Sequence, residues 1–382
     1  MMNYSEEEVG MKKILIVIGT LKTGGAEKIT VELIENMNRV AMEFYFLVFG
    51  NDIGDYEERV KRIGGKVIHA ERPSFPYYRY KCELKRIWKE EGPFDIVHTH
   101  TLLNNGINCK IFHDLGCPQL ISHSHSTESN RKNNIITKVY EYLMKKLIRD
   151  YATDYLACGR GAGEYLYGRE LFREKGIIVR NGVNFDDVSF DPEVRERLRV
   201  QMDLKNVCVI GHVARLADVK NHEFVLEILK ELKKNFVNYK YIIVGDGPNK
   251  EKIKNKTKEL NLEKEVIMLG NREDVTLLQN VFDLVVYPSF YEGIPLALVE
   301  AQINGIPCIV SENVSREVQL REKTKFVSLD KSAKEWAQEV REYQYITREN
   351  NLMLKEGKQY DIKCSAEKLR QIYMGDKKKI YE

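Results

Sequence analysis

The sequence contains no uninterrupted apolar run that approaches the roughly 18–20 residues of a membrane-spanning helix. It also lacks strong net charge, at +3 over 382 residues, so the basic surface of a nucleic-acid-binding protein is not expected. Residues 1–10 are acidic and polar, unlike a signal peptide, and Met11 is a second candidate for the physiological start. We therefore expect a cytoplasmic protein with no nucleic-acid partner.

Cysteine pairs at metal-binding or redox spacing are absent as well. The seven cysteines are scattered, odd in number and mostly set among apolar residues, and none forms a Cys-x-x-Cys pair. This pattern predicts reduced core residues and argues against a zinc site or a disulfide framework.

The length is too great for one ordinary core and fits two domains. Short apolar runs alternate with longer amphipathic segments, a pattern typical of α/β folds with parallel, doubly wound sheets. The pattern restarts after the turn-rich stretch 181–192. We predict two Rossmann-like domains, residues 11–185 and 186–364. Ligands of such sheets bind outside the carboxyl ends of the strands.

Residues 287–300 combine a strand end, a glycine loop and the start of a helix. The apolar run 282–286 predicts a buried strand, Gly293 marks the loop, and Pro295 suits a first helical turn, where its missing N–H is not needed. A helix N-terminus at the carboxyl edge of a sheet favours anions such as phosphate.

Glu292 and Glu300 flank this helix start. Carboxylates do not bind phosphate, but they accept hydrogen bonds from hydroxyl groups. A nucleotide sugar contains both phosphate and hydroxyl groups. It therefore suits a site where N–H dipoles bind phosphate and carboxylates accept hydrogen bonds from hydroxyls. The alternative is a structural strand–loop–helix unit with two solvated glutamates.

The setting Glu-Gly-x-x-Leu-x-x-x-Glu-Ala from Glu292 to Ala301 closely resembles the donor motif of family-4 glycosyltransferases. Three further features resemble the branch that builds bacterial capsular and exopolysaccharides: Gln302, the Gly-Ile-Pro-Cys of 305–308, and Pro295, where the wider family has Gly. The resemblance implies the GT-B fold, in which two Rossmann-like domains face a central cleft. It also implies that a last helix, about 365–382, crosses back onto the first domain.

The same resemblance assigns tasks to the loop. Glu292 accepts hydrogen bonds from donor-sugar hydroxyls, and Glu300 holds the ribose hydroxyls. The helix N-terminus supports the diphosphate through Gly293, Ile294, Pro295 and Leu296. In related proteins the backbone around the residue matching Arg272 holds the base edge.

Arg215 and Lys220 follow the first strand of the second half. Arg215 offers a planar fork of donors and Lys220 a compact charge, and together they can neutralise a diphosphate leaving group without a metal. The resemblance implies this catalytic task for both. The alternative is a surface loop with two basic residues.

Gly24 and Gly25 follow the first strand of the chain in Gly-Gly-Ala-Glu. Glycine allows close approach of a ligand, and the helix behind favours a phosphate. The spacing differs from the dinucleotide fingerprint Gly-x-Gly-x-x-Gly, which argues against a nicotinamide enzyme. The loop resembles the family loop that faces the diphosphate and acceptor; an ordinary tight turn is the alternative.

Two histidine pairs end neighbouring strands of the first half: His98 with His100, and His123 with His125. Alternate spacing places each pair on one face of its strand. Such pairs can bind a metal, but no carboxylate stands close beside either, and ordinary hydrogen bonding is the alternative. The resemblance implies that His123 or His125 lies against the donor sugar, which spacing does not decide, and that His100 lies toward the acceptor.

Residues 131–150 form a basic segment with an apolar stripe at Ile135, Ile136, Val139, Tyr140, Leu143 and Leu147. The pattern predicts a helix packed on the sheet by that stripe, with its polar side solvated. The alternative, prompted by lipid-linked acceptors in the polysaccharide branch, is peripheral contact with the inner face of the cytoplasmic membrane.

The sequence thus predicts a retaining hexosyltransferase that uses a UDP-hexose or UDP-N-acetylhexosamine, with no metal and no other cofactor. Its acceptor is expected to be a glycan or lipid-linked glycan in exopolysaccharide or capsule biosynthesis. One alternative is a nucleotide-sugar 2-epimerase of the same fold, which requires a water-activating acid/base set. Another is a non-catalytic sugar-nucleotide-binding partner, marked by loss of Arg215, Lys220 or Glu292, all of which are present.

Overall fold

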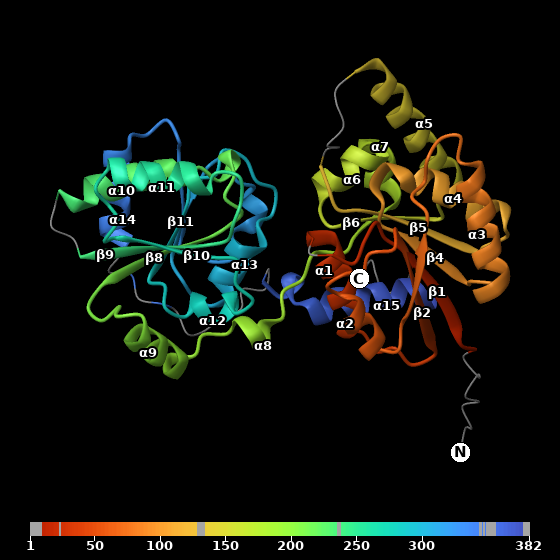
Figure 1. Cartoon of the computed structure of the whole chain (residues 1–382), viewed down its shortest axis with the longest axis horizontal. Coiled ribbons are helices and arrows are strands. Elements are labelled where there is room, and N and C mark those ends of the chain that lie inside the picture. The colour runs from red at the N-terminus through yellow and green to blue at the C-terminus, as the bar shows by residue number, and fades with distance from the viewer. Residues whose placement is uncertain are drawn as a thin grey trace. The chain divides into compact units, whose positions relative to one another are not determined.

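The computed structural model describes residues 10–22, 24–127, 134–234, 238–343, 346, 348 and 357–376. It divides into two compact units (Figure 1). Unit 1 comprises Met1–Gly182 and Ile362–Glu382, and unit 2 comprises Val183–Asp361. The chain therefore leaves unit 1 after Gly182 and returns to it at Ile362.

Unit 1 is built on a seven-stranded parallel sheet of order β3-β2-β1-β4-β5-β6-β7. The strand order reverses between β1 and β4, so the carboxyl ends of these two strands form the topological switch point, where such sheets bind ligands. The strands are β1 (Lys12–Val17), β2 (Met42–Phe49), β3 (Lys66–Ala70), β4 (Ile96–Thr99), β5 (Gln119–Ser124), β6 (Asp154–Ala157) and β7 (Gly176–Ile178).

Helices cover both faces of this sheet, which is why its strands are near-continuous apolar runs instead of alternating ones. One face packs against α1, α2 and α15, and the other against α3 and α4. The helices of unit 1 are α1 (Gly25–Glu35), α2 (Glu57–Arg62), α3 (Tyr78–Glu91), the short 3₁₀ helix η1 (Leu102–Asn104), α4 (Asn105–Asp114), α5 (Ile135–Tyr151), α6 (Arg160–Tyr167), α7 (Arg169–Lys175) and α15 (Ile362–Met374).

Unit 2 is also built on a parallel sheet, here with six strands in the order β10-β9-β8-β11-β12-β13. Its switch point lies between β8 and β11. The strands are β8 (Cys208–Val213), β9 (Tyr239–Val244), β10 (Val266–Gly270), β11 (Leu284–Tyr287), β12 (Cys308–Ser311) and β13 (Thr324–Val327).

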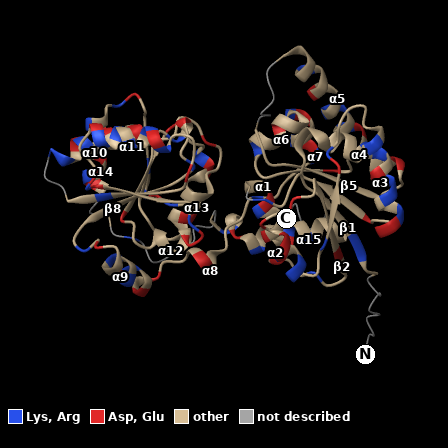
Figure 2. Cartoon of the chain, in the orientation of Figure 1, with Lys and Arg blue, Asp and Glu red and all other residues tan. Residues whose placement is uncertain are grey.

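The helices of unit 2 also form two layers. Helices α8, α12 and α13 pack on one face and α10, α11 and α14 on the other. Figure 2 shows that charged residues gather on the outer helices such as α10 and α11, while the strands of the sheet carry few of them. The helices are α8 (Phe185–Val188), α9 (Pro192–Gln201), η2 (Asp218–Lys220), α10 (His222–Lys233), α11 (Lys250–Glu259), α12 (Val275–Gln279), α13 (Leu296–Ile303), η3 (Arg316–Val318), α14 (Ala333–Tyr343) and η4 (Gly357–Tyr360).

Helix α15 joins the core of unit 1 although it comes from the end of the chain. Its Ala366, Leu369 and Ile372 are buried in the same cluster as the apolar residues of α1 and β2. The Lys12 Nζ donates a hydrogen bond of 2.8 Å to the carbonyl oxygen of Tyr373. The last described helix therefore completes one face of the first sheet.

Helix α5 departs from its prediction. It packs on α4, where a Cβ at Gly106 would lie 2.4 Å from the carbonyl oxygen of Met144. The buried side chains of α5 are Met144 and Ile148, because only its second half is covered by neighbours. The prediction that its apolar stripe packs on the sheet was wrong: much of the stripe is exposed, by 79% at Ile135, 78% at Ile136, 54% at Val139 and 48% at Leu143. Arg131 and Lys132 lie outside the described residues.

Candidate functional site

The switch point of unit 2 brings together two of the predicted catalytic residues. Lys220 ends η2, just beyond β8, and Glu292 lies in the loop that follows β11. The Lys220 ammonium forms an ion pair with Oε1 of Glu292 and donates a hydrogen bond of 3.1 Å to the Tyr287 hydroxyl. Only 16% of each charged side chain is exposed. The pair is thus partly withdrawn from water, where its attraction is stronger than at the surface.

Tyr287 lies at the centre of this group. Burial raises the pKa of its hydroxyl well above the ordinary value, and the nearby carboxylates of Glu292 and Glu300 raise it further. The hydroxyl therefore stays protonated. Glu300, in the second turn of α13, accepts a hydrogen bond of 3.0 Å from Nε2 of Gln279.

Helix α13 begins at Leu296 with Pro295 as its N-cap, one residue beyond the predicted start. Gly293 is exposed in the loop, Ile294 is partly exposed and Pro295 is buried. No side chain of the described residues caps the first turn of the helix. Its N–H groups are thus available to an anion, as the sequence pattern predicts.

Two predicted arginines of unit 2 lie at the surface. Arg215 is exposed just beyond β8, and its guanidinium has no hydrogen-bond or ion-pair partner within the described part of the chain. Arg272, beyond β10, pairs with both carboxylate oxygens of Asp274, at 2.8 and 2.7 Å. The structure therefore brings Lys220, Glu292 and Glu300 around Tyr287, with Arg272 occupied by a neighbouring carboxylate.

In unit 1 the glycine loop leads into α1, for which Gly24 is the N-cap. The carboxylate of Glu27 lies over this position, because a Cβ at Gly24 would be only 2.2 Å from its Oε2. No atom of the described residues lies within 4 Å of a Cβ built at Gly25. A carboxylate already faces this helix N-terminus, so a phosphate would have to displace the Glu27 side chain.

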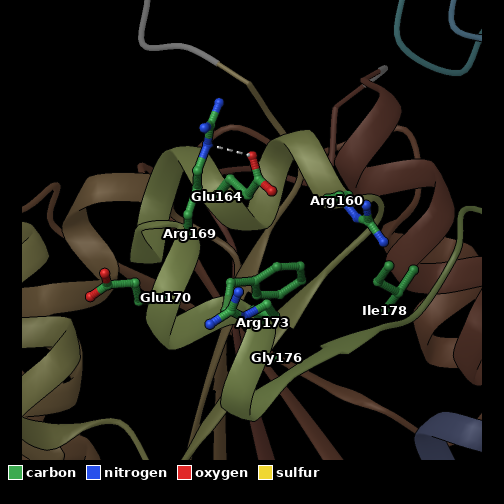
Figure 3. A pocket seen from close by; sticks show the side chains of 8 residues that line it. Arg160, Glu164, Arg169, Glu170, Arg173, Gly176 and Ile178 are labelled. Carbon is green, nitrogen blue, oxygen red and sulfur yellow. Dashed lines mark ion pairs between the residues drawn. The ribbon is translucent and has the colours of Figure 1, made fainter.

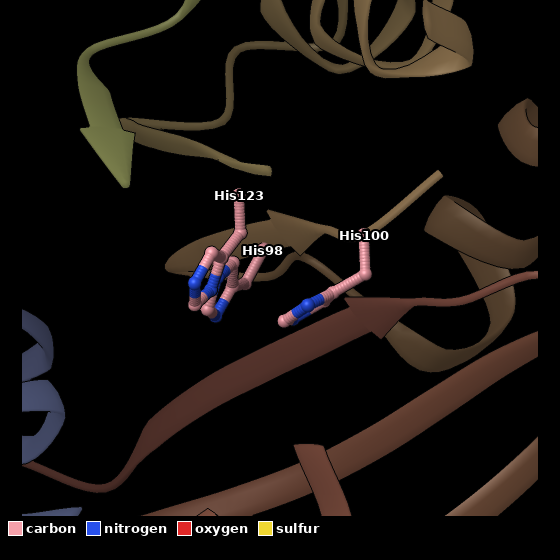
Figure 4. Close-up of side chains that lie close together, drawn as sticks. All are labelled: His98, His100 and His123. Atoms are coloured by element: carbon pink, nitrogen blue, oxygen red, sulfur yellow. The ribbon is translucent and has the colours of Figure 1, made fainter. Parts of the chain in front are cut away.

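The four histidines gather at the carboxyl ends of β4 and β5, on the sheet face covered by α1 and α15. His98 Nε2 lies 3.2 Å from Nδ1 of His123, and His100 Nδ1 lies 2.8 Å from Nε2 of His125. The rings of His98 and His123 are parallel within 2° and are seen with His100 in Figure 4. The register of β4 and β5 therefore joins the two predicted pairs into one cluster.

All four imidazoles are held neutral. Burial, with the neighbouring imidazoles, lowers the pKa values of His98, His100 and His123 well below the ordinary value. Burial lowers the pKa of His125 to about 4. Three ring nitrogens in the cluster are shielded from water and have no hydrogen-bond partner among the described residues: Nε2 of His100, Nε2 of His123 and Nδ1 of His125.

A ring nitrogen from each of His98, His100 and His123 lies within 4.8 Å of the others, a spacing that would admit a metal ion. The ring pair of His98 and His123 nevertheless has hydrogen-bond geometry, with nearly parallel rings and facing nitrogens, so these lone pairs do not converge on one point. The cluster therefore fits a hydrogen-bonding site better than a metal centre.

A separate pocket of 490 Å³ lies beside the edge strand β7, between α6 and α7. Figure 3 shows the ion pair of Arg169 with Glu164 on one side and Arg160 near Ile178 on the other. None of its lining residues belongs to the predicted site. The charged groups that line it are of both signs and give the pocket no strong preference for one ligand charge.

Sequence reasoning missed the partners that orient the predicted residues. Tyr287 contacts Lys220, Gln279 contacts Glu300, and Tyr373 contacts His98. Tyr287 lies within the motif itself, but Gln279 and Tyr373 are far from their partners in sequence. No local pattern signals such contacts.

Two family models match the chain: "Glycosyltransferase Family 4" over residues 23–187 and "Glycosyl transferases group 1" over residues 194–359. The putative glycosyltransferase EpsF of Bacillus subtilis is 31% identical over 312 residues, 80% of this chain and 81% of that protein. The capsular polysaccharide biosynthesis glycosyltransferase CapH of Staphylococcus aureus is 24% identical over 95% of this chain and 99% of its own.

An Escherichia coli relative, UDP-Gal:alpha-D-GlcNAc-diphosphoundecaprenol alpha-1,3-galactosyltransferase, is 31% identical over 60% of each chain. Among solved structures, HepE of Anabaena in complex with UDP matches 96% of this chain and 100% of its own, with a TM-score of 0.79 at 18% identity. This likeness confirms the predicted GT-B fold. None of the helices in the described part of the chain is both long enough and apolar enough to span a bilayer.

Proposed function

Because this chain belongs to family 4 of the glycosyltransferases, we propose that it transfers a hexose or N-acetylhexosamine from a UDP-sugar to a glycan hydroxyl, with retention of configuration. The product is a bacterial exopolysaccharide or capsule precursor. The observation that carries this proposal is the grouping of Lys220, Glu292 and Glu300 around Tyr287 at the switch point of unit 2. It joins one cation and two hydroxyl acceptors beside a free helix N-terminus.

In the reaction, the bond between the anomeric carbon and the diphosphate oxygen breaks and a bond to the acceptor oxygen forms on the same face. The leaving phosphate takes the acceptor proton. Lys220, Arg215 and the N-terminus of α13 stabilise the developing negative charge, the kind of preorganised electrostatic help that dominates many active sites. Glu292 and Glu300 accept hydrogen bonds from the sugar and ribose hydroxyls. Positive charge comes from the protein, so the scheme uses no metal.

The ion pair adds a step to this scheme. Lys220 is paired with Glu292 in the structure. A diphosphate arriving at Lys220 shares its charge and leaves Glu292 free to accept from a sugar hydroxyl. Donor binding thus exchanges a contact within the protein for two contacts with the ligand.

A lipid-linked acceptor is supported by helix α5. Its exposed Ile135, Ile136, Val139, Tyr142 and Leu143 form an apolar face, called here the α5 face. Exposed basic residues, Lys138, Lys146 and Arg149, lie on the same helix. An apolar face with basic neighbours suits an anionic phospholipid surface. The name of the E. coli relative specifies an undecaprenol-linked acceptor, which a membrane-docked enzyme would reach.

Cosedimentation with vesicles tests this contact. We expect the full chain to bind vesicles of phosphatidylcholine with phosphatidylglycerol, and to bind phosphatidylcholine alone more weakly. Ile136→Glu should reduce binding, because a charge would enter the apolar face. Ile53→Glu is the matched control, since Ile53 is 76% exposed in unit 1 but lies outside α5. Equal binding of both variants, or no binding at any salt concentration, would exclude the α5 face as a membrane contact.

The catalytic proposal is tested by calorimetric titration with UDP, GDP, ADP and NAD, each with and without EDTA. An EDTA-insensitive response specific to UDP is expected. Product analysis with a UDP-sugar then separates transfer from 2-epimerisation, because an epimerase releases free UDP and an epimerised sugar without any acceptor. Nucleotide affinity without turnover on any acceptor would indicate a binding protein.

A further inference from the structure

Tyr373 of α15 makes one polar contact that reaches the histidine cluster. Its side chain is 0% exposed, and its hydroxyl oxygen lies 2.7 Å from Nδ1 of His98. No other polar partner of this hydroxyl occurs among the described residues. If the hydroxyl accepted a hydrogen bond from His98, its own hydrogen would be buried without an acceptor, which is costly. Tyr373 is therefore the donor and His98 Nδ1 the acceptor.

The direction of the hydrogen bond from Tyr373 to His98 determines the direction of the bond between His98 and His123. A neutral imidazole carries one proton, so with Nδ1 accepting, His98 carries its proton on Nε2. His98 Nε2 then donates to Nδ1 of His123 at 3.2 Å. By the same rule His123 carries its proton on Nε2. That atom is shielded from water and has no partner in the described part of the chain, so it is an N–H donor available to a ligand acceptor.

Thr30 of α1 sets the tautomers of the other two histidines, His100 and His125. The Thr30 hydroxyl donates to the carbonyl oxygen of Ala26 at 2.7 Å, so its oxygen can only accept from His100 Nδ1, 3.4 Å away. His100 therefore carries its proton on Nδ1 and shares it with Nε2 of His125 at 2.8 Å. This leaves an acceptor at Nε2 of His100 and an N–H donor at Nδ1 of His125, neither of which has a partner among the residues that the structure describes.

We infer that Tyr373 is a positioning residue which, through His98, sets the tautomer of His123 and so completes a site for sugar hydroxyls in unit 1. This site consists of N–H donors on His123 and His125 and an acceptor nitrogen on His100. A hydroxyl both donates and accepts, so it matches such a mixed set. A phosphate oxygen only accepts, and the lone pair of His100 disfavours it. This inference rests on the proposed function, because it names the part of the sugar substrate that the cluster holds.

Tautomers can be measured directly by long-range ¹⁵N–¹H correlation spectra of the full chain labelled at histidine nitrogens. We expect the Nε2-protonated form at His98 and His123, and the Nδ1-protonated form at His100 and His125. In Tyr373→Phe the donor to His98 is lost, so His98 and His123 should shift toward the other tautomer or a mixture. Tyr155→Phe is the control, because the buried Tyr155 of unit 1 donates to the carbonyl of Arg149, away from the cluster. A His123 protonated on Nδ1 in the unmodified chain would overturn the inference, and so would unchanged tautomers in Tyr373→Phe.

Binding measurements test the ligand class. The probes are UDP and a panel of UDP-glucose, UDP-galactose and their N-acetylamino counterparts, each titrated calorimetrically. Tyr373→Phe should lower the affinity for whichever UDP-sugar binds by about two- to tenfold, which corresponds to one hydrogen bond, and should leave UDP affinity unchanged. The sugar assignment would be overturned if the affinities for UDP and for the UDP-sugar fell equally, or if neither affinity fell. If the unmodified chain binds none of these ligands, the proposed function fails, and the tautomer spectra still decide whether Tyr373 sets His123.

Discussion

Lys220 and Glu292, which are separated by 72 positions in the chain, form an ion pair beside the Tyr287 hydroxyl. The sequence assigns them to opposite ends of the donor, the lysine to the diphosphate and the glutamate to the sugar. Their contact means that neither can be altered without changing the charge felt by the other. Substitutions at this pair should therefore affect nucleotide affinity and turnover differently.

Lys220→Ala should weaken UDP binding by about 2–5 kcal/mol, because a partly buried cation that faces the diphosphate is removed and Glu292 is left unpaired. Glu292→Ala should not weaken UDP binding, since it frees the ammonium for the diphosphate, and should lower turnover. Calorimetry with UDP and initial rates with the UDP-sugar check both. A parallel loss of UDP affinity in the two variants would contradict the division of tasks.

Glu300→Ala should also weaken UDP binding, because the ribose hydroxyls would lose their acceptor. Gln279→Met should have a smaller effect, about 0.5–1.5 kcal/mol, because it removes only the hydrogen bond that orients the Glu300 carboxylate. UDP titration of both variants gives the comparison. If Glu300→Ala bound UDP as tightly as the unmodified chain, the ribose assignment would be wrong.

Gly245→Ala should reduce the free energy of unfolding by about 2 kcal/mol or more. Gly245 has φ of +136°, and a Cβ there would lie 2.1 Å from the carbonyl oxygen of Ala214. Gly293→Ala is the matched control, because a Cβ there would have no atom of the described chain within 4 Å. Urea unfolding of both variants tests the prediction, and similar midpoints would refute the steric argument.

Stability should fall as the pH drops from about 6.5 toward 4. Burial lowers the folded-state pKa of His125 and of His222 to about 4, whereas an unfolded histidine titrates near 6.5. Between these values the unfolded chain binds protons that the folded chain does not, which costs up to about 1.4 kcal/mol per pH unit for each such histidine. Urea midpoints from pH 7.5 to 4.5 measure the slope. His125→Asn should flatten it, and the exposed His113→Asn serves as the control; equal slopes in the two would contradict the prediction.

Much of the fold follows from local pattern. The apolar run 282–286 predicts a buried strand, and β11 occupies Leu284–Tyr287, because sheets covered on both faces need continuous burial. The motif that contains Glu292 and Glu300 could be located because loop, helix start and carboxylates are close in sequence.

Contacts between distant segments could not be located in this way. The pairing of His98 with His123 depends on the register of β4 against β5, and its link to Tyr373 depends on where α15 packs. The exposure of Ile135 and Ile136 depends on how far α5 extends past α4. Periodicity identifies an apolar face but does not state what lies against it.

The return of α15 to unit 1 has a consequence for biosynthesis. Residues up to Gly182 emerge from the ribosome before unit 2 does, yet the helix that covers one face of their sheet is made only after unit 2. Until then the apolar surface that will contact Leu369 and Ile372 remains open, while unit 2 is complete in sequence and free to fold. Until α15 emerges, the first unit is therefore unfinished and exposes an apolar face, the kind of surface that chaperones bind.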